Sequence, residues 1–170
     1  ISLTFRSNVP IDKLLAMTWQ EQVRRDLSDC LEIKLNGVES TTIYKQLSEG
    51  IYQAVILDWT GAYPDPRAYL FPLLSCQKII EDKCIHGEAV FSGSFWATPK
   101  IQKALEESEQ LMGTERSIKL LEIEQYAASG GAYLPVWIVN PIAWAQLNIN
   151  KPKFDGSGFL LLELLEKEIK

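Results

Sequence analysis

The stretch Leu57–Pro66, LDWTGAYPDP, holds the residues whose types and spacing could do chemistry on a small molecule. Two carboxylates, Asp58 and Asp65, flank the indole of Trp59. A carboxylate pair is the machinery of glycoside hydrolysis, which needs an acid beside a base or nucleophile. Acids on turns are usually solvated, however, and the sequence identifies no neighbours that would support this pair. A small hydrolase using Asp58 and Asp65 therefore stays an alternative, and no residue is assigned as catalytic.

The same loop is suited to contact rather than catalysis. A glycine and two prolines leave its backbone few conformations. The loop is therefore expected to be rigid and to hold the indole ring of Trp59 in place for contact with a ligand. It also follows an apolar run at 51–57, and in open α/β sheets ligands bind beyond the carboxyl ends of the strands. A simpler interpretation is that Trp59 covers the core while Asp65 closes an Asx-turn before a proline.

Other reactive side chains are few. Cys30, Cys76, Cys84 and the single His86 lack the spacing of a zinc site, and Gly156–Gly158 lacks the spacing and the lysine of a P-loop. We therefore expect no metal and no cofactor. A bridge between Cys76 and Cys84 would close a short polar loop, as in proteins of oxidising compartments. We expect Cys30 to be a buried free thiol.

Composition narrows the class of protein. The chain has 170 residues with a net charge of -5, and its basic residues are scattered, which argues against nucleic acid as a partner. No apolar run reaches the roughly 18 residues that a transmembrane helix needs. The sequence opens directly on an apparent strand without a starting Met, so we expect a chain cut from something longer.

Hydrophobic periodicity predicts alternating strands and helices. The first 58 residues are expected to form β-α-β-α-β, with strands at 1–5, 31–35 and 51–57 and helices at 11–28 and 41–47. After them the sequence predicts a loop-rich middle to about Ala97, helices beginning at Thr98–Pro99 and at Thr114, a strand at 133–140 and a helical tail beyond Gly158.

In their order, these elements resemble the C-terminal lobe of family 5 extracellular solute-binding proteins, which serve peptide- and nickel-type ABC importers. One family motif, G-x-Y-D followed by W-x-x-D-Y-x-D-P and a leucine, is matched at Gly50, Tyr52, Trp59, Tyr63, Asp65, Pro66 and Leu70. A second, E-R followed by Y-L-P-V, is matched at Glu115, Arg116, Tyr133, Leu134, Pro135 and Val136.

The resemblance implies an α/β fold, a periplasmic-binding-protein-like lobe. It would consist of a β-α-β-α-β sheet followed by two helices, a further strand and a C-terminal tail. Residues 1–140 would form the C-terminal ligand-binding lobe. Residues 141–170 would be a crossover segment that returns to an N-terminal lobe outside this chain.

The resemblance also implies a ligand-binding set. In the family the tryptophan of this loop lines the pocket, and Trp59 matches it. The expected ligand-binding residues are Trp59, Thr60, Gly61, Ala62, Tyr63 and Trp96. Many peptide-binding members carry an Asp three residues after that tryptophan to hold the ammonium of the ligand. Ala62 stands there instead, which puts free-amine peptides in doubt.

The function implied is non-enzymatic. The chain would be part of the substrate-binding component of an ABC importer, capturing a peptide-like or other small solute between two lobes and delivering it to permease subunits in the membrane. The location would be extracytoplasmic, in the periplasm or anchored by a lipid at the cell surface, with Cys76 and Cys84 bridged. A sensor or interaction domain with the same fold is a further alternative.

Overall fold

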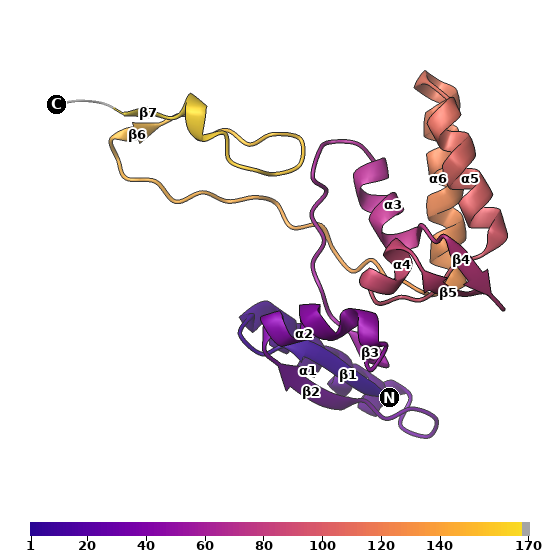
Figure 1. Cartoon of the computed structure of the whole chain (residues 1–170). Coiled ribbons are helices and arrows are strands. Elements are labelled where there is room, and N and C mark those ends of the chain that lie inside the picture. The colour runs from indigo at the N-terminus through magenta and orange to yellow at the C-terminus, as the bar shows by residue number, and fades with distance from the viewer. Residues whose placement is uncertain (168–170) are drawn as a thin grey trace. The chain divides into compact units, whose positions relative to one another are not determined.

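A computed structural model covers the chain and describes residues 1–167 (Figure 1). The last three residues of the predicted crossover segment, 168–170, lie outside the described part. The chain divides into two compact units. The first contains Ile1–Asp58 and Leu73–Lys103, and the second contains Trp59–Pro72 and Ala104–Lys170.

The first unit contains a parallel sheet of three strands in the order β2-β1-β3. Helices connect the strands, so the predicted β-α-β-α-β unit is confirmed. The elements are β1 (Ser2–Arg6), α1 (Pro10–Asp26), β2 (Lys34–Val38), α2 (Ser40–Gln46), the 3-10 helix η1 (Leu47–Glu49) and β3 (Ala54–Val55). β3 is shorter than the predicted strand at 51–57, although the N–H of Ile56 still donates to the carbonyl of Thr4 at 2.9 Å.

Apolar residues of the sheet and of α1 form the core beside β1. Leu3 and Phe5 of β1 pack with Ile56 and with Leu15 and Ala16 of α1. Each large side chain buried in this way stabilises the fold by about 1.5–3 kcal/mol. This core holds the carboxyl ends of β1 and β3 beside each other.

The predicted loop-rich middle contains regular structure that the sequence analysis missed. β4 (Lys78–Ile80) and β5 (Lys83–His86) form a hairpin followed by the short helix α4 (Glu88–Phe91). The two turn residues, Glu81 and Asp82, both have positive φ, as a tight type I′ turn requires.

The three cysteines differ in state. Cys76 and Cys84 form a disulfide across a Cα–Cα distance of 5.8 Å. Cys30 is free and exposed, so the expectation of a buried thiol is wrong. The reason is local: α1 ends at Asp26, and Cys30 lies in the turn before β2.

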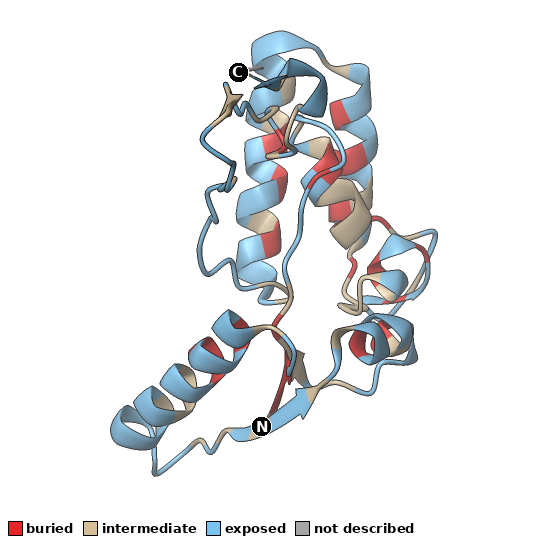
Figure 2. Ribbon diagram, turned by 90° about the vertical axis from the view of Figure 1, so that its left-hand side faces the viewer, coloured by how far each residue is buried: buried red, intermediate tan, exposed pale blue. Residues whose placement is uncertain are grey.

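The second unit is mainly helical. α6 (Gly113–Gly130) buries Leu120, Ile123 and Ala127 along one side, which Figure 2 colours red. It ends at Gly130, and the next residue, Gly131, is the C-cap with a left-handed φ of 69°. No helix among residues 1–167 is long and apolar enough to cross a membrane.

Two more helices contribute to both units. α5 (Pro99–Gln110) begins as the sequence predicts, since the Thr98 hydroxyl accepts from the N–H of Ile101 at 3.3 Å. α3 (Arg67–Leu74) was not predicted. Its sequence carries Pro66 before the first turn and Pro72 inside, and the many prolines of the segment suggested a loop.

Two predictions about the end of the chain are wrong. Residues 133–140 form no strand, because no described strand pairs with them and Pro135 lacks an N–H to donate. The leucine-rich tail is not a helix either, since a short helix is marginal without packing. Up to residue 167 it contains the 3-10 helix η2 (Leu162–Leu164) and β7 (Glu166–Lys167) instead, and β7 pairs with β6 (Ile149–Asn150), which precedes the tail.

Candidate functional site

The loop Trp59–Pro66 belongs to the second unit and is fixed by its neighbours. The indole N–H of Trp59 donates to the carbonyl of Ala68 at 3.3 Å, yet the residue is 46% exposed. Gly61 is buried, and a Cβ at this position would lie 2.5 Å from Cε2 of Tyr69. Only glycine fits there without movement of the tyrosine ring, so the loop is held close to α3 while Trp59 stays partly exposed.

The remaining residues of the predicted set leave polar groups available. Among the described residues, no hydrogen bond uses the main-chain N–H groups of Thr60, Gly61 or Ala62. The hydroxyl of Tyr63 accepts from Nη1 of Arg67 at 3.2 Å. The loop therefore combines an accessible aromatic surface with a short run of uncommitted main-chain donors.

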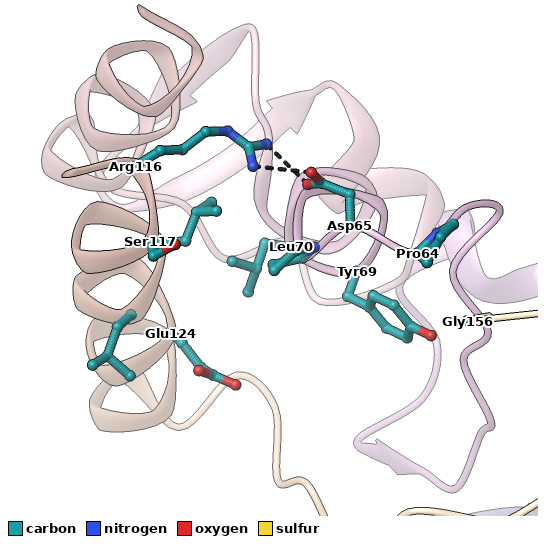
Figure 3. A pocket seen from close by; sticks show the side chains of 11 residues that line it. Pro64, Asp65, Tyr69, Leu70, Arg116, Ser117, Glu124 and Gly156 are labelled. Atoms are coloured by element: carbon teal, nitrogen blue, oxygen red, sulfur yellow. Dashed lines mark hydrogen bonds and ion pairs between the residues drawn. The ribbon is translucent and has the colours of Figure 1, made fainter. Parts of the chain in front are cut away.

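Asp65 has a structural position. Its Oδ1 accepts from the N–H of Arg67 at 2.8 Å, which is the predicted Asx-turn, here at the start of α3. Arg116 of α6 donates to both carboxylate oxygens at 2.9 Å (Figure 3). The hydrogen bonds from Arg116, and secondarily from the Arg67 main chain, hold the pKa of Asp65 below its ordinary value. Asp65 therefore stays ionised near neutral pH and cannot serve as a general acid there.

The second unit also contains an open cavity of about 480 Å³ beside α3 and α6 (Figure 3). Its walls combine the Asp65–Arg116 pair with apolar side chains and with Glu124. The lining residues are Pro64, Asp65, Pro66, Tyr69, Leu70, Arg116, Ser117, Leu120, Leu121, Glu124 and Gly156. None of the predicted ligand-binding residues lines this cavity.

The first unit carries a polar cluster at the carboxyl end of its sheet that the sequence analysis did not identify. Arg6, at the end of β1, is buried and donates from Nε and Nη2 to the buried carboxylate of Asp12, at 2.6 and 3.1 Å. Its Nη1 donates to Oδ1 of Asp58 at 2.5 Å and to the hydroxyl of Tyr44 at 3.2 Å. The Tyr44 hydroxyl in turn donates to Oδ1 of Asp58 at 2.8 Å.

The cluster also fixes the protonation state of two of its members. The hydrogen bond to Asp12 is the largest cause of a raised pKa at Arg6, so the guanidinium stays charged. Burial, followed by the hydrogen bond to Asp58, raises the pKa of Tyr44, which therefore remains a proton donor. One sequence signal existed: an arginine at the end of an apolar strand followed by an aspartate in the first turn of a helix.

The last predicted site residue, Trp96, lies in the first unit. It is half-buried and forms an isolated antiparallel bridge with Lys83 of β5. Its N–H donates to the hydroxyl of Ser94 at 3.3 Å. Trp96 is thus attached to the hairpin of the first unit, whereas Trp59–Tyr63 belong to the second.

No group of three or more His, Cys, Asp or Glu side chains that could hold a metal ion occurs within residues 1–167. The two aspartates of the hydrolase alternative are each held in an ion pair, with Arg6 and with Arg116.

Solved structures with the same fold identify the architecture. No family model matches the chain, and no curated protein sequence does. The dipeptide binding protein from Pseudoalteromonas sp. SM9913, solved with Met-Leu, is 17% identical at a TM-score of 0.71, over 99% of this chain and 32% of its own. The pheromone receptor PrgZ is 13% identical at a TM-score of 0.72, over 99% and 30%. NikA from Brucella suis, in complex with Fe(III)-EDTA, is 21% identical at a TM-score of 0.67, over 99% and 32%.

The chain therefore spans about a third of the length of these proteins. At such low identities the likeness concerns the fold. The fold that the resemblance implied is confirmed, because the match extends over 99% of the chain in all three structures. The chain has the α/β fold of one part of these substrate-binding proteins.

Proposed function

We propose that the chain is one lobe of the substrate-binding component of an ABC importer, and that it captures a peptide-like or other small solute against a second lobe. The observation that carries this proposal is the likeness over 99% of the chain to a dipeptide binding protein and to a pheromone receptor described by its peptide binding. Closure of two lobes would let contacts from both sides stabilise the ligand-bound state.

The loop Trp59–Tyr63 is the proposed wall of the site. Trp59 would supply apolar area and stacking, since its ring is anchored at the indole nitrogen and partly exposed. The N–H groups of Thr60 and Ala62, two exposed residues of the loop, would donate to carbonyl or carboxylate oxygens of the ligand, while Gly61 would keep the loop close to Tyr69. Trp96 is a separate proposed contact residue, which belongs to the first unit.

The domain division follows the same proposal. Residues 1–140 would form the ligand-binding lobe, and 141–170 would be the segment that crosses to the other lobe. Large apolar side chains of that segment are exposed, and Trp144 is 96% exposed. Exposed apolar residues in such number favour burial against another surface, and the second lobe would provide it.

An extracytoplasmic location is part of the proposal. The disulfide between Cys76 and Cys84 supports it, because disulfides persist in oxidising compartments. One of the similar structures carries the description of a periplasmic murein tripeptide binding protein. The partners would be permease subunits in the membrane.

A non-enzymatic role accords with the state of the two candidate acids. Asp58 and Asp65 each accept from an arginine, and the pKa of Asp65 is lowered. Hydrolysis would need one carboxyl group with a raised pKa to donate a proton.

The test is to identify the natural solute. The two-lobed protein would be purified without refolding and denatured, and the released small molecules would be analysed by mass spectrometry. We expect a peptide or similar solute that rebinds the emptied protein in a saturable way and is recovered unchanged. Chemical turnover of the bound molecule, or the absence of saturable binding by any recovered solute or peptide mixture, would contradict the proposal.

A further inference from the structure

The open cavity beside α3 and α6 is separate from the proposed wall of the solute site. All of its lining residues belong to the second unit, so the cavity lies within one compact part of the chain. Its volume of about 480 Å³ is in the range of small-molecule sites, which measure about 300–1,000 Å³. Trp59–Tyr63 do not line it, so a molecule bound in the cavity would leave the proposed wall uncovered.

The walls of the cavity are mainly apolar and come from two helices. α3 contributes Tyr69 and Leu70, and α6 contributes Leu120 and Leu121. Tyr69 is 37% exposed and Leu121 is 52% exposed, so part of this apolar surface faces water. Because removal of apolar surface from water is favourable, the walls favour a ligand with an apolar body.

Three charged side chains line the cavity, and two of them neutralise each other. Arg116 and Asp65 form a two-pronged ion pair. Glu124 is exposed, and within residues 1–167 its carboxylate has no ion pair or hydrogen bond. Figure 3 shows its side chain extending from α6 toward the side on which α3 lies. The lining therefore carries one unpaired negative charge.

The arrangement along α6 separates the charges. Glu124 follows Arg116 by eight positions of the helix, which corresponds to about 12 Å along its axis. Leu120 and Leu121 lie between them in the helix. The cavity thus has a neutralised ion pair at one end, apolar surface in the middle and a free carboxylate at the other end. A complementary molecule is apolar along its body and positively charged at one end.

We propose that this cavity is a second binding site, which takes a small organic cation with an apolar body, such as an aryl-alkyl amine. Glu124 would pair with the ammonium group, and the aromatic ring would pack against Tyr69 and the leucines. An anion of the same shape would be repelled by the unpaired carboxylate. The inference does not rest on the proposed function, since it uses no residue of Trp59–Tyr63.

The experiment uses three probes of one shape on the two-lobed protein: phenylbutylamine, phenylbutanol and phenylbutyrate. Methyl-labelled Leu70, Leu120 and Leu121 report binding by NMR, and Leu15 of the first unit is the internal reference. We expect the amine to shift the three cavity leucines in a saturable way and to bind about threefold more tightly than the alcohol. The acid should bind more weakly than the alcohol. Saturation with the copurified solute should leave the shifts in place, because the two sites are separate.

Glu124→Gln is the decisive variant. It should raise the dissociation constant of the amine about threefold and leave that of the alcohol unchanged, because an exposed ion pair contributes modestly. Glu115→Gln is the matched control, since it removes an exposed charge of the same helix outside the cavity. Leu121→Ala should weaken the amine and the alcohol to the same degree, because it removes apolar wall and no charge.

The absence of any shift at the cavity leucines overturns the inference. So does equal binding of the amine and the acid, or an amine affinity that is the same in Glu124→Gln and in the wild type. Displacement of the amine by the solute overturns it as well, because the cavity would then be part of the solute site. The proposed function is tested separately, by binding of the recovered solute, and stands or fails without regard to these results.

Discussion

Arg116 of α6 donates two hydrogen bonds of 2.9 Å to the carboxylate of Asp65. This pair connects the loop after Trp59 to a helical residue that lies 51 positions after Asp65 in the chain. The same carboxylate accepts from the N–H of Arg67 at the start of α3. One side chain thus terminates the loop, begins a helix and binds a second helix. The end of the loop that begins at Trp59 is fixed at this junction.

Asp65→Asn should destabilise the protein by about 1 kcal/mol. The amide keeps an oxygen for the Arg67 N–H but loses the charged, two-pronged pair with Arg116, which is partly exposed and therefore of moderate strength. Urea denaturation measures the difference. Glu124→Gln on α6 is the matched control, since this exposed acid lines the same cavity, and it should leave the midpoint unchanged. A loss for Glu124→Gln as large as that for Asp65→Asn would contradict the account.

The stabilisation from Asp65 should depend on pH in a defined direction. The pKa of Asp65 is lower in the folded protein than its ordinary value of 3.8. The contribution is therefore complete above the ordinary value and is lost as the pH falls through the folded value. The free-energy difference between the wild type and Asp65→Asn should be constant from about pH 5 to 7 and should shrink below about pH 4. A difference that grew on acidification would have the wrong sign.

Asp12→Asn should be more costly, at about 3 kcal/mol. Asp12 is 3% exposed and Arg6 is 7% exposed, so removing the carboxylate weakens the pairing of a buried guanidinium. Thermal and urea unfolding measure the loss. Glu21→Gln removes one partner of the exposed pair with Arg24 and should change nothing measurable. Equal effects of the two substitutions would show that burial of the Arg6 pair does not matter.

Gly61→Ala should destabilise the second unit by about 1–3 kcal/mol, because the added methyl group meets the ring of Tyr69. Tyr69→Ala in the same protein should recover much of that loss, and a double-mutant cycle measures the coupling. Ala62→Ser, at the exposed neighbouring position, is the control for the folding measurement. Independent, additive effects of the substitutions at 61 and 69 would mean that the two residues do not constrain each other.

The sequence alone was sufficient to predict those strands and helices whose signals, hydrophobic periodicity and helix capping, lie within one short stretch. The alternating strands and helices of residues 1–58 and the start of α5 at Thr98–Pro99 followed from such signals. α3 was missed because its segment is rich in proline, although proline is compatible with the first turn of a helix. The strand expected at 133–140 failed for another reason: an apolar run becomes a strand only when a partner strand is present.

The candidate site shows the same limit. The loop Trp59–Tyr63 could be singled out because its residue types are unusual for a turn. The complete cluster of Arg6, Asp12, Tyr44 and Asp58 could not, since only Arg6 and Asp12 are near in sequence and Asp58 comes beside Arg6 through the pairing of β1 with β3. A contact that depends on sheet topology has no signature in any short stretch of sequence.

Titration calorimetry of the two-lobed protein with its copurified solute tests the central claim most directly, through the substitution Trp59→Ala. We expect the dissociation constant to rise at least tenfold, because the partly exposed indole would supply a large part of the contact area. Phe91→Ala, which removes an exposed aromatic ring from α4, is the control and should leave the affinity unchanged. An affinity that is the same in Trp59→Ala and in the wild type would contradict the assignment of this loop as the wall of the ligand site.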